Sequence, residues 1–412
     1  MSHRVSSNVH LDIAIIGGGI AGLWLLNRLR RAGYQVALLE SKALGGDQTM
    51  GSQGMIHGGI KYTLTGAFSA ASETIAHMPQ YWRDCLSGKG EVDLSNANLL
   101  SDHFYMWSTA HITSKLTTFF ASKAARGRVE KITTKDLPEI FQHPLFKGKL
   151  YRLVDMVVDV PSVVQALVDN TSGHYFKIDW SQAHWEISPQ YHASLMIESP
   201  QCQLHIQAKQ FIFTAGKGNS ALMAQLGINE PAMQIRPLHQ VMVKHHYPFP
   251  FYGHCLGLEK TPRLTISSHP TADNQQVWYL GGSLAEQGAN ENADTVITKA
   301  RHELHELMPW LDFSHAQWAS LRIDRAEPRQ IGLTRPDNAF AQPADNMHNV
   351  IVAWPTKLTL APNLANQLLA LLQQQNILPS NKTDSLQTLQ CLPTPTVATP
   401  PWDTAFNTLD KG

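Results

Sequence analysis

Three glycines and one carboxylate near the start of the chain have the types and spacing of a dinucleotide-binding site. Gly17, Gly19 and Gly22 fit the pattern G-x-G-x-x-G, and Glu40 follows about 20 residues further on. The first glycine of this pattern permits a tight turn, the second lets the backbone approach a pyrophosphate, and the third lets a helix pack closely on a strand. A carboxylate placed like that of Glu40 can accept hydrogen bonds from a ribose. The chemistry that these residues indicate is therefore binding of NAD or FAD.

The sequence around the glycines predicts the strand–helix–strand unit that has to position them. Residues 12–16 and 35–39 are apolar runs that predict buried strands, and a helix with leucines on one face and arginines on the other lies between them. The first turn of that helix, which contains Ile20 and Ala21, would offer unpaired N–H groups and a positive dipole end to phosphates. A Gly-rich turn in an unrelated α/β domain is the alternative. It does not explain why strand, helix, second strand and terminal acid all occur in register.

The composition is that of a globular protein, and it excludes some classes of function. The 412 residues are enough for two domains, and 43% hydrophobic residues are enough for a sizeable core. Lys and Arg total 33, as do Asp and Glu, so overall basic charge cannot drive nucleic-acid binding. No apolar run approaches about 18 residues, and the N-terminus lacks the apolar core of a signal peptide. We therefore expect no nucleic-acid partner, no integral membrane segment and a cytoplasmic location.

The cysteines and histidines show neither a disulfide framework nor a metal-binding pattern. Cys85, Cys202, Cys255 and Cys391 are far apart, which predicts free thiols in a reducing compartment. The 20 histidines are scattered, and neither H-x-x-x-H nor C-x-x-C occurs. We therefore expect no metal site.

A Gly- and Ser-rich loop follows the second strand and leads into a distinctive segment. The loop, residues 44–54, can wrap closely around a ligand, and residues 55–62 read MIHGGIKY. The part IHGGIKY resembles the Ile-His-Gly-Gly-x-Arg-Tyr segment of flavin-dependent glycerol-3-phosphate dehydrogenases and oxidases. More broadly, the N-terminal unit resembles the D-amino-acid-oxidase-like superfamily of FAD enzymes. The resemblance implies that this segment lies beside the flavin ring, with Lys61 in place of the family's arginine.

The resemblance continues, less closely, as far as residue 375. A strand over 210–214 that ends in Ala215 and Gly216 is similar to the family's second FAD contact, although an ordinary βα turn is the alternative. Residues 357–359 match a Gly-Gly-Lys-Leu-Thr-Thr motif, whose glycines are lost around Trp354 and Pro355. The cofactor contacts expected from the glycine motif and the resemblance are Gly17, Gly19, Ile20, Ala21, Gly22, Glu40, Ser41, Thr49, Ser52, Gln53, Gly54, Met55, Ala215, Gly216, Lys357, Leu358 and Thr359.

The resemblance also implies which residues carry the reaction: His57, Lys61, Tyr62, His239 and Arg322. His57 and His239 are candidate proton acceptors or hydrogen-bond partners, since imidazole titrates near neutral pH, and for His57 the favoured role is packing beside the flavin. Arg322 could hold a substrate carboxylate or phosphate through two hydrogen bonds, and Lys61 could add a less directional charge. A cation such as that of Lys357 near the N1–C2=O edge of a flavin would stabilise the reduced ring. Structural histidines and solvated lysines are the alternatives.

The order of these segments predicts an elaborated α/β (α+β) fold with two domains. An FAD-binding Rossmann-like domain would comprise residues 1–75, 150–235 and 320–375, and a substrate-binding antiparallel β-sheet domain would comprise 76–149 and 236–319. Residues 376–412 contain several prolines and predict an extended arm or a disordered tail.

The function predicted from the resemblance is that of an FAD-dependent oxidoreductase. It would oxidise a small anionic C–OH or C–N substrate (a 2-hydroxy acid, an amino acid or a phosphorylated polyol) by hydride transfer to flavin N5. The sequence leaves the electron acceptor open, O2 or a quinone, as it does a peripheral membrane or protein partner. One alternative is a flavin-bearing module that acts only in a complex, with the Pro-rich arm as its docking segment. A plain NAD(P) dehydrogenase is another, but it leaves the 45–62 loop and the Lys357 motif unexplained.

Overall fold

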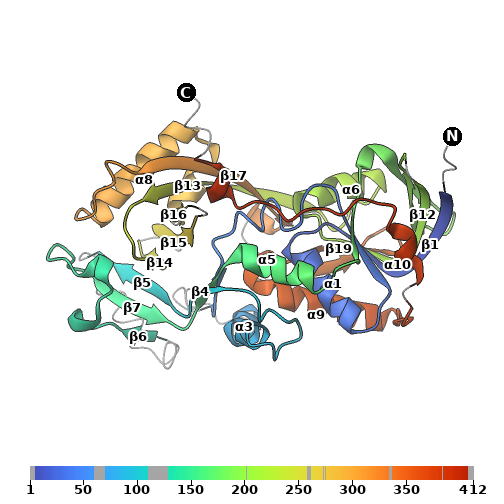
Figure 1. Ribbon diagram of the computed structural model, residues 1–412, viewed down its shortest axis with the longest axis horizontal. Coiled ribbons are helices and arrows are strands. Elements are labelled where there is room, and N and C mark those ends of the chain that lie inside the picture. Colours follow the sequence, from blue (N-terminus) through green and yellow to red (C-terminus); the bar gives the residue numbers. More distant parts are fainter. Residues whose placement is uncertain are drawn as a thin grey trace.

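The computed structural model shows an elongated molecule with one large β-sheet toward each end (Figure 1). The structure describes residues 5–59, 70–109, 129–200, 202–257, 261–271, 273, 275–333, 336–382 and 384–406. Lys61, Tyr62 and the helix expected at 112–125 lie outside the described residues.

The first sheet contains the predicted strand–helix–strand unit. Its strands are, in spatial order, β10 (Ala183–Ile187), β11 (Ala193–Glu198), β12 (Cys202–Phe213), β1 (Val5–Ile16), β2 (Val36–Glu40) and β9 (Tyr175–Lys177), with β19 (Val350–Trp354) and β18 (Phe340–Pro343) continuing from β12. β1 pairs in parallel with both β2 and β12. Its residues 13–16 are all buried, which explains their continuous apolar run, because a central parallel strand is covered on both faces.

Helices cover both faces of this sheet. Those that contribute to its two apolar layers are α1 (Ile20–Arg31), α5 (Val160–Asp169), α9 (Ala361–Gln374), α6 (Asn219–Gln225) and α10 (Asp384–Leu389). Ile13 and Ile15 of β1 pack with α1, α5 and α9, whereas Ala14 and Ile16 pack with α6 and α10. Successive side chains of a strand point to opposite faces, so this alternation places β1 between the two helical layers. The start of α1 is thereby fixed at the end of β1.

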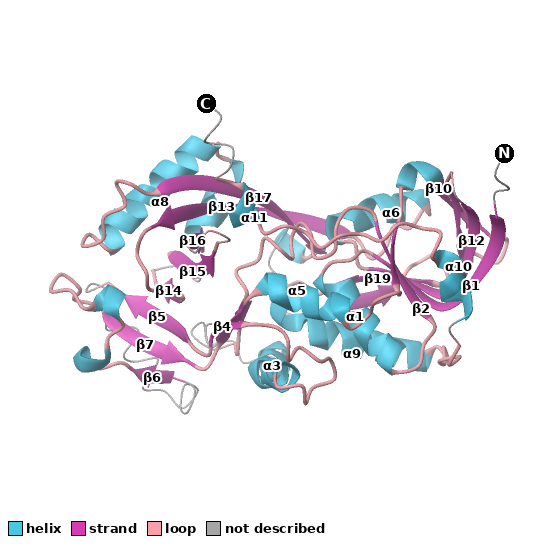
Figure 2. Ribbon diagram, viewed as in Figure 1, coloured by secondary structure: helices cyan, strands magenta, loops and turns pink. Residues whose placement is uncertain are grey.

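The second sheet is predominantly antiparallel (Figure 2). Its strands are, in spatial order, β17 (Gln317–Pro328), β13 (Met233–His245), β16 (Gln276–Gly281), β15 (Leu264–Pro270), β14 (Gly253–Cys255), β5 (Phe104–Ser108), β7 (Lys149–Leu153) and β6 (Val129–Lys131). The pairing of β14 with β5 is parallel. One face packs on α8 (Ala293–Leu307), whose buried residues Val296, Ala300 and Leu304 join the cluster of Val241 and Val243.

A small third sheet lies between the two large ones (Figure 1). It consists of β3 (Met55–Ile56), β8 (Met156–Val158) and β4 (Leu99–Ser101). β4 and β5 are close in sequence but belong to different sheets. The remaining elements are α3 (Ala70–Leu86), α7 (Ser283–Gln287), α11 (Pro401–Thr404), η3 (Thr134–Asp136), η4 (Glu139–Phe141), η5 (Trp180–Gln182), η6 (Gly216–Gly218), η7 (Gly288–Asn290), η8 (Ile331–Leu333) and η9 (Leu358–Leu360). Within the described ranges, no helix has the length and apolar character required to cross a bilayer.

The C-terminal residues are packed on the body of the protein, so the prediction of a disordered tail is wrong for residues 384–406. α10 packs on the first sheet, and residues 390–406, which we call the C-terminal strap, run from there to the second sheet. Trp402 of the strap is only 3% exposed. Prolines therefore mark an extended, packed segment here.

The prediction of four free thiols is also wrong. Cys202 of β12 and Cys391 of the strap form a disulfide, whereas Cys85 and Cys255 are buried free thiols. The two bonded cysteines are 189 residues apart in sequence. The packing of α10 on the first sheet brings them together, and no local sequence pattern reports that packing.

Candidate active site and cofactor cradle

The turn between β1 and α1 has the close contacts that require glycine. Gly17 has φ +112°, and a Cβ built on it would lie 2.5 Å from Cα of Ala215. A Cβ on Gly22 would lie 2.0 Å from the carbonyl oxygen of Gly17. The helix N-cap, Gly19, has no side chain to cap the first turn, and Thr49 Oγ1 accepts a hydrogen bond from Ile20 N at 3.0 Å. A turn of this kind leaves backbone N–H groups and the positive helix end for a pyrophosphate.

The other cradle residues surround this turn. Glu40 ends β2, and its carboxylate accepts hydrogen bonds from Gly18 N at 2.6 Å and Lys42 N at 2.7 Å, which fix it beside the turn. Gly216 has φ +57°, and among the described residues no atom beyond its own chain neighbours lies within 4 Å of the position of a Cβ there, so the space beside it is open. Ser52 Oγ is buried with no hydrogen-bond partner among the described residues. These features fit FAD, with the pyrophosphate at 17–22, a ribose at Glu40 and further contacts from Ser52 and Gly216.

The loop after β2 joins the cradle to the second sheet. Gln53 Nε2 donates to the carbonyl oxygen of Tyr279 at 2.7 Å, and Tyr279 Oη donates to that of Gly51 at 3.0 Å. Ala326 N donates to Gln48 Oε1 at 3.2 Å. The predicted loop contact Gln53 therefore lies where the cradle meets β16, whereas Gly54 and Met55 lie against β8 of the third sheet.

His57 follows β3 and is held from two sides. His57 N donates to Thr359 Oγ1 at 3.2 Å, and Thr359 Oγ1 donates to Met55 O at 3.2 Å. On the other side, Asp155 Oδ2 lies 3.5 Å from His57 Nδ1, and Asp155 Oδ1 accepts a hydrogen bond from Gly58 N at 2.8 Å. Both side chains are largely buried, 14% exposed for His57 and 6% for Asp155. Thr359, a predicted cofactor contact, thus also fixes the backbone that carries His57.

The second sheet contributes His254, which lies against His57. The His254 ring stacks on His57 with centroids 5.8 Å apart and an interplanar angle of 22°. His254 Nδ1 is 2.8 Å from Thr265 Oγ1, its partner residue on β15. Cys255 and Leu264 face the α8 side of the sheet, so His254 and Thr265 face the opposite side, toward His57.

The predicted catalytic residues His239 and Arg322 do not lie beside His57 and His254. They are paired neighbours on β13 and β17, but both face the α8 side of the sheet. His239 Nδ1 lies 3.1 Å from Glu291 O and Nε2 lies 2.9 Å from Ser320 Oγ, and Arg322 donates to the carbonyl oxygens of Ala289 and Glu291. Burial lowers the pKa of His239, and the charge of Arg322 lowers it further. The geometry gives both residues a structural role and does not support the prediction that they are catalytic.

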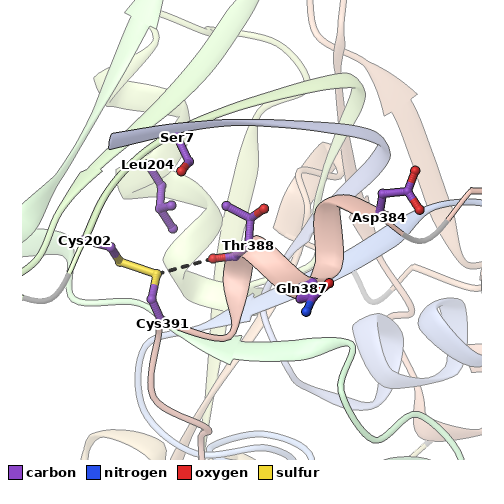
Figure 3. Close-up of a pocket in the computed structure, with 7 residues that line it drawn as sticks. All are labelled: Ser7, Cys202, Leu204, Asp384, Gln387, Thr388 and Cys391. Atoms are coloured by element: carbon purple, nitrogen blue, oxygen red, sulfur yellow. Dashed lines mark hydrogen bonds between the residues drawn. A yellow bond between two sulfur atoms is a disulfide. The ribbon is translucent and has the colours of Figure 1, made fainter. Parts of the chain in front are cut away.

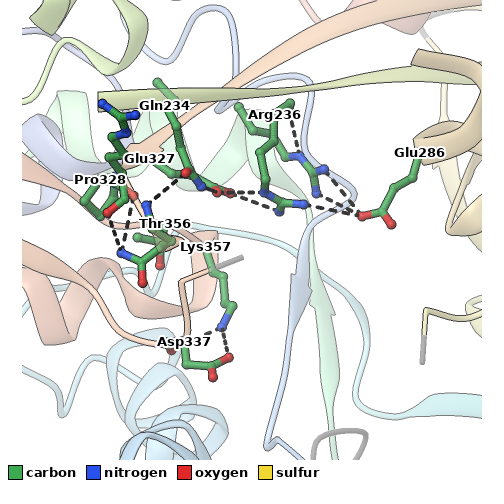
Figure 4. Close-up of polar contacts among 12 residues, drawn as sticks. Gln234, Arg236, Glu286, Glu327, Pro328, Asp337, Thr356 and Lys357 are labelled. Carbon is green, nitrogen blue, oxygen red and sulfur yellow. Dashed lines mark hydrogen bonds and ion pairs between the residues drawn. The ribbon is translucent and has the colours of Figure 1, made fainter. Parts of the chain in front are cut away.

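Lys357 reaches a carboxylate of the chain itself. Its Nζ donates to Asp337 O at 3.1 Å and lies 3.7 Å from Asp337 Oδ1, and the side chain points away from the Arg236 ion pairs (Figure 4). Arg236 makes two hydrogen bonds to the fully buried Glu327, at 2.8 and 3.2 Å.

The backbone is unusual where the family's glycines are lost. Thr356 there has φ +59°, a conformation that costs a β-branched residue strain energy.

Two residues of this site, Asp155 and His254, were not predicted from the sequence. Asp155 follows β7, and His254 lies in the three-residue strand β14, where no motif distinguishes it from the other histidines. The remaining predicted site residues, Lys61 and Tyr62, lie outside the described residues. The described site is therefore the glycine cradle, with His57, Asp155, Thr359 and His254 at its junction with the second sheet.

Comparison with protein families decides the class of this fold and cradle. Residues 12–361 match the model of the family described as FAD dependent oxidoreductase (DAO). The chain belongs to this family. It is 47% identical over 399 residues to the probable FAD-dependent oxidoreductase PA4991 of Pseudomonas aeruginosa, covering 96% of this chain and 98% of that protein. The crystal structure of PA4991 superposes with a TM-score of 0.82 at 42% identity, over 98% of this chain and 100% of that one.

More distant structures share the fold. Glycine oxidase from Geobacillus kaustophilus has a TM-score of 0.64 at 15% identity, covering 89% of this chain and 95% of that one. The L-α-glycerophosphate oxidase of Mycoplasma pneumoniae, with FAD bound, has a TM-score of 0.61 at 13% identity, covering 88% and 95%. The predicted fold, an FAD-binding Rossmann-type structure with a second sheet domain, is therefore confirmed. So are the predicted cofactor, FAD, and the prediction that the chain is an FAD-dependent oxidoreductase.

Proposed function

We propose that this oxidoreductase oxidises a C–OH or C–N bond of a small anionic molecule, and that His57 accepts the substrate proton. The observation that carries the proposal is the junction of His57 with Asp155 and His254, where the cofactor cradle meets the second sheet. A buried imidazole beside a carboxylate is suited to move a proton. FAD, when bound, supplies the acceptor for the hydride of the oxidised carbon.

The neighbours of His57 have separate tasks in this proposal. Asp155 faces Nδ1, so the neutral ring carries its proton on that nitrogen and Nε2 has the lone pair that accepts a proton. Thr359 fixes the backbone of residue 57, and His254 packs against the ring and restricts its rotation. The substrate would lie beside His57 on the side of the cradle, enclosed by the two sheets and thereby shielded from water.

The anionic character of the substrate has two supports. The oxidases with this fold that are named above are named for glycine and α-glycerophosphate, which carry a carboxylate and a phosphate, respectively. The segment IHGGIKY also carries Lys61 two residues after the glycine pair, and we propose Lys61 and Tyr62 as substrate contacts. Arg322, which the sequence predicted to hold the anion, is not part of this proposal, because its guanidinium binds carbonyl oxygens on the far face of the sheet.

Other parts of the proposal concern the setting of the reaction. We propose the two domains stated above, except that β7 and β17 belong with the substrate domain, because both pair within the second sheet. We also propose a cytoplasmic location and O2 or a quinone as the electron acceptor. The proposal of a partner-dependent module loses its main support, because residues 390–406 pack on this chain and are not an arm for docking.

The test is anaerobic bleaching of the flavin absorbance by a panel of candidate substrates. Amino acids, 2-hydroxy acids and glycerol phosphate are each paired with an analogue that lacks the carboxylate or phosphate: an amino alcohol, a diol or glycerol. We expect at least one compound with the anionic group to bleach the flavin and its analogue to do so at least about 100-fold more slowly, since loss of a charge-assisted hydrogen bond costs several kcal/mol. Equal bleaching by a charged compound and its analogue would contradict the anionic assignment. No bleaching by any anion, with photoreduction intact, would contradict the whole proposal.

A further inference from the structure

The Cys202–Cys391 disulfide and the C-terminal strap are not used by the proposed function. We propose that this disulfide is a site of exchange with a small thiol, and that its opening releases the strap from the two sheets that it joins. The proposal is independent of the substrate and of the role of His57.

A cavity gives a small molecule access to the disulfide. The two cysteines form part of the wall of a cavity of about 340 Å³, and the other lining residues are Ser7, Leu204, Asp384, Gln387 and Thr388 (Figure 3). This volume is in the range that small ligands occupy. Four of the five other lining residues carry a hydroxyl, an amide or a carboxylate, so the cavity suits a polar thiol.

The two sulfur atoms differ in access. Cys202 is 1% exposed, whereas Cys391 is partly exposed at the cavity. A thiolate in the cavity therefore attacks Sγ of Cys391. The new S–S bond forms as the old one breaks, and the electron pair leaves on Sγ of Cys202, which takes up a proton. A second thiolate then attacks the bound small thiol, forms the small-molecule disulfide and leaves Cys391 as a thiol. Two small thiols are oxidised and one protein disulfide is reduced.

The buried sulfur has a polar neighbour that suits its role as leaving group. Ser199 Oγ lies 3.4 Å from Cys202 Sγ, and it also accepts a hydrogen bond from Cys202 N at 3.0 Å. In the disulfide form this hydroxyl donates to Cys202 O at 3.1 Å, and on reduction it can turn to donate to the thiolate, which lowers the cost of releasing it in a buried position. If the protein lies in the reducing compartment that we propose, a disulfide there is expected to be reversible.

The strap that the disulfide anchors passes the cofactor cradle. Leu44 N donates to Thr396 O at 2.8 Å and Ala398 N donates to Leu44 O at 2.9 Å, so the strap pairs with the loop after β2. The Leu44 side chain borders the glycine turn, since a Cβ on Gly18 would lie 2.7 Å from Leu44 Cδ2. Beyond this point, Trp402 stacks on His269 of the second sheet with centroids 4.1 Å apart. Opening the disulfide removes the first of these anchors, and the hydrogen bond from Lys177 N of β9 to Pro393 O, at 2.7 Å, remains.

The experiment uses the full FAD-loaded protein, oxidised with glutathione disulfide and then treated with reduced glutathione. Alkylation in denaturant should label two thiols before treatment, Cys85 and Cys255, and all four cysteines after complete reduction with dithiothreitol. At limiting glutathione, mass spectrometry should find the adduct on Cys391. Chymotrypsin should cut after Trp402 on the order of tenfold faster once the disulfide is open, because the strap then detaches more often.

Two variants serve as controls. Cys391→Ser should be cut rapidly without any thiol and should take no adduct. Cys85→Ser, which changes a buried cysteine away from the strap, should have one labelled thiol fewer and otherwise be cut and modified as the unchanged protein is. Four labelled thiols in the oxidised protein, an adduct on Cys202, or an unchanged rate of cutting after Trp402 would overturn the proposal. Thiol labelling and the rate of cutting after Trp402 are both measured on the native protein and need no variant.

Discussion

At the scale of single residues, the proposed chemistry depends on how tightly His57 is held. Its backbone is tied to Thr359, its Nδ1 faces Asp155 and its ring packs on His254. A proton acceptor gains rate only if it is within reach of the proton in the correct tautomer. Asp155 therefore acts as a positioning residue, since its carboxylate faces Nδ1 and also fixes the backbone of Gly58.

Asp155→Asn should slow flavin reduction while leaving FAD bound. The amide keeps an acceptor for Gly58 N but loses the negative charge that orients and stabilises the His57 ring. We expect reduction to be about 10- to 100-fold slower, within the range of general-base effects. Stopped-flow absorbance with the substrate from the panel measures the rate. A Thr356→Ser variant, which keeps the hydroxyl that donates to Asn338 O, should remain within about threefold of the native rate. Native kinetics for Asp155→Asn would rule out the positioning role.

His269 makes the stability of the protein depend on pH. It is fully buried, and burial lowers its pKa to about 3. The unfolded chain protonates this histidine below about pH 6.5. Between pH 6.5 and 3 the unfolded state therefore binds one proton more than the native state, and the free energy of unfolding falls as the pH falls, by about 1.4 kcal/mol per pH unit.

His269→Gln should remove this contribution to the pH dependence. Urea unfolding at several values between about pH 7 and pH 5 gives the slope of the free energy of unfolding against pH. This slope should be shallower in the variant by up to about 1.4 kcal/mol per pH unit, which corresponds to one proton. Part of the slope should remain, because burial also lowers the pKa of His245, to about 4. A slope equal to that of the native protein would contradict the neutral, buried state of His269.

At the scale of elements, the strand register decides which side chains reach the site. Motif matching selected His239 and Arg322, and both lie on the predicted strands β13 and β17. A motif match does not fix the face of a strand, because a shift of one residue moves every side chain to the opposite face. The cradle was predictable because its glycines, helix and Glu40 are close in sequence. His254 was not, because its position depends on long-range pairing of β14 with β15 and β5.

The packing of α1 on the glycine turn gives a prediction about cofactor binding. Gly22→Ala places a methyl group 2.0 Å from the carbonyl oxygen of Gly17, so the turn or the helix has to move. Overpacking of this kind costs about 1–3 kcal/mol, and we expect FAD to bind at least about tenfold more weakly. Fluorescence titration of the apoprotein with FAD measures the change. Ala32→Ser, at the exposed far end of the same helix, is the matched control and should bind FAD as the native protein does. Equal affinity in the two variants would contradict the cradle.

At the scale of the whole molecule, the C-terminal strap joins the two large sheets. It begins at the disulfide on β12 and ends where Trp402 and Phe406 pack with Met242, Val277 and Tyr279. Local patterns in the sequence could not predict this path, since its contacts with β12, Leu44 and β15 are all distant along the chain. The two-sheet fold, in contrast, was predictable because the family motifs occur in order.

Trp402→Ala should destabilise the protein strongly, although Trp402 lies near the C-terminus. The indole is 3% exposed, and loss of a buried Trp typically costs about 3–5 kcal/mol. Denaturant unfolding measures the change. Leu378→Ala, at a leucine that is 63% exposed, should change the free energy of unfolding by less than about 0.5 kcal/mol. Similar small effects for both variants would show that the strap does not hold the second sheet.

The most direct test of the proposed active site compares the two histidines that the sequence analysis named as candidate proton acceptors. His57→Asn and His239→Gln are each mixed anaerobically with the substrate that bleaches the native flavin, and the rate of flavin reduction is recorded. The structure places His57 at the cradle and His239 on the far face of the second sheet. We predict a loss of about 100-fold or more for His57→Asn, and a rate within about threefold of the native one for His239→Gln. A large loss for His239→Gln with a near-native rate for His57→Asn would contradict the proposed site.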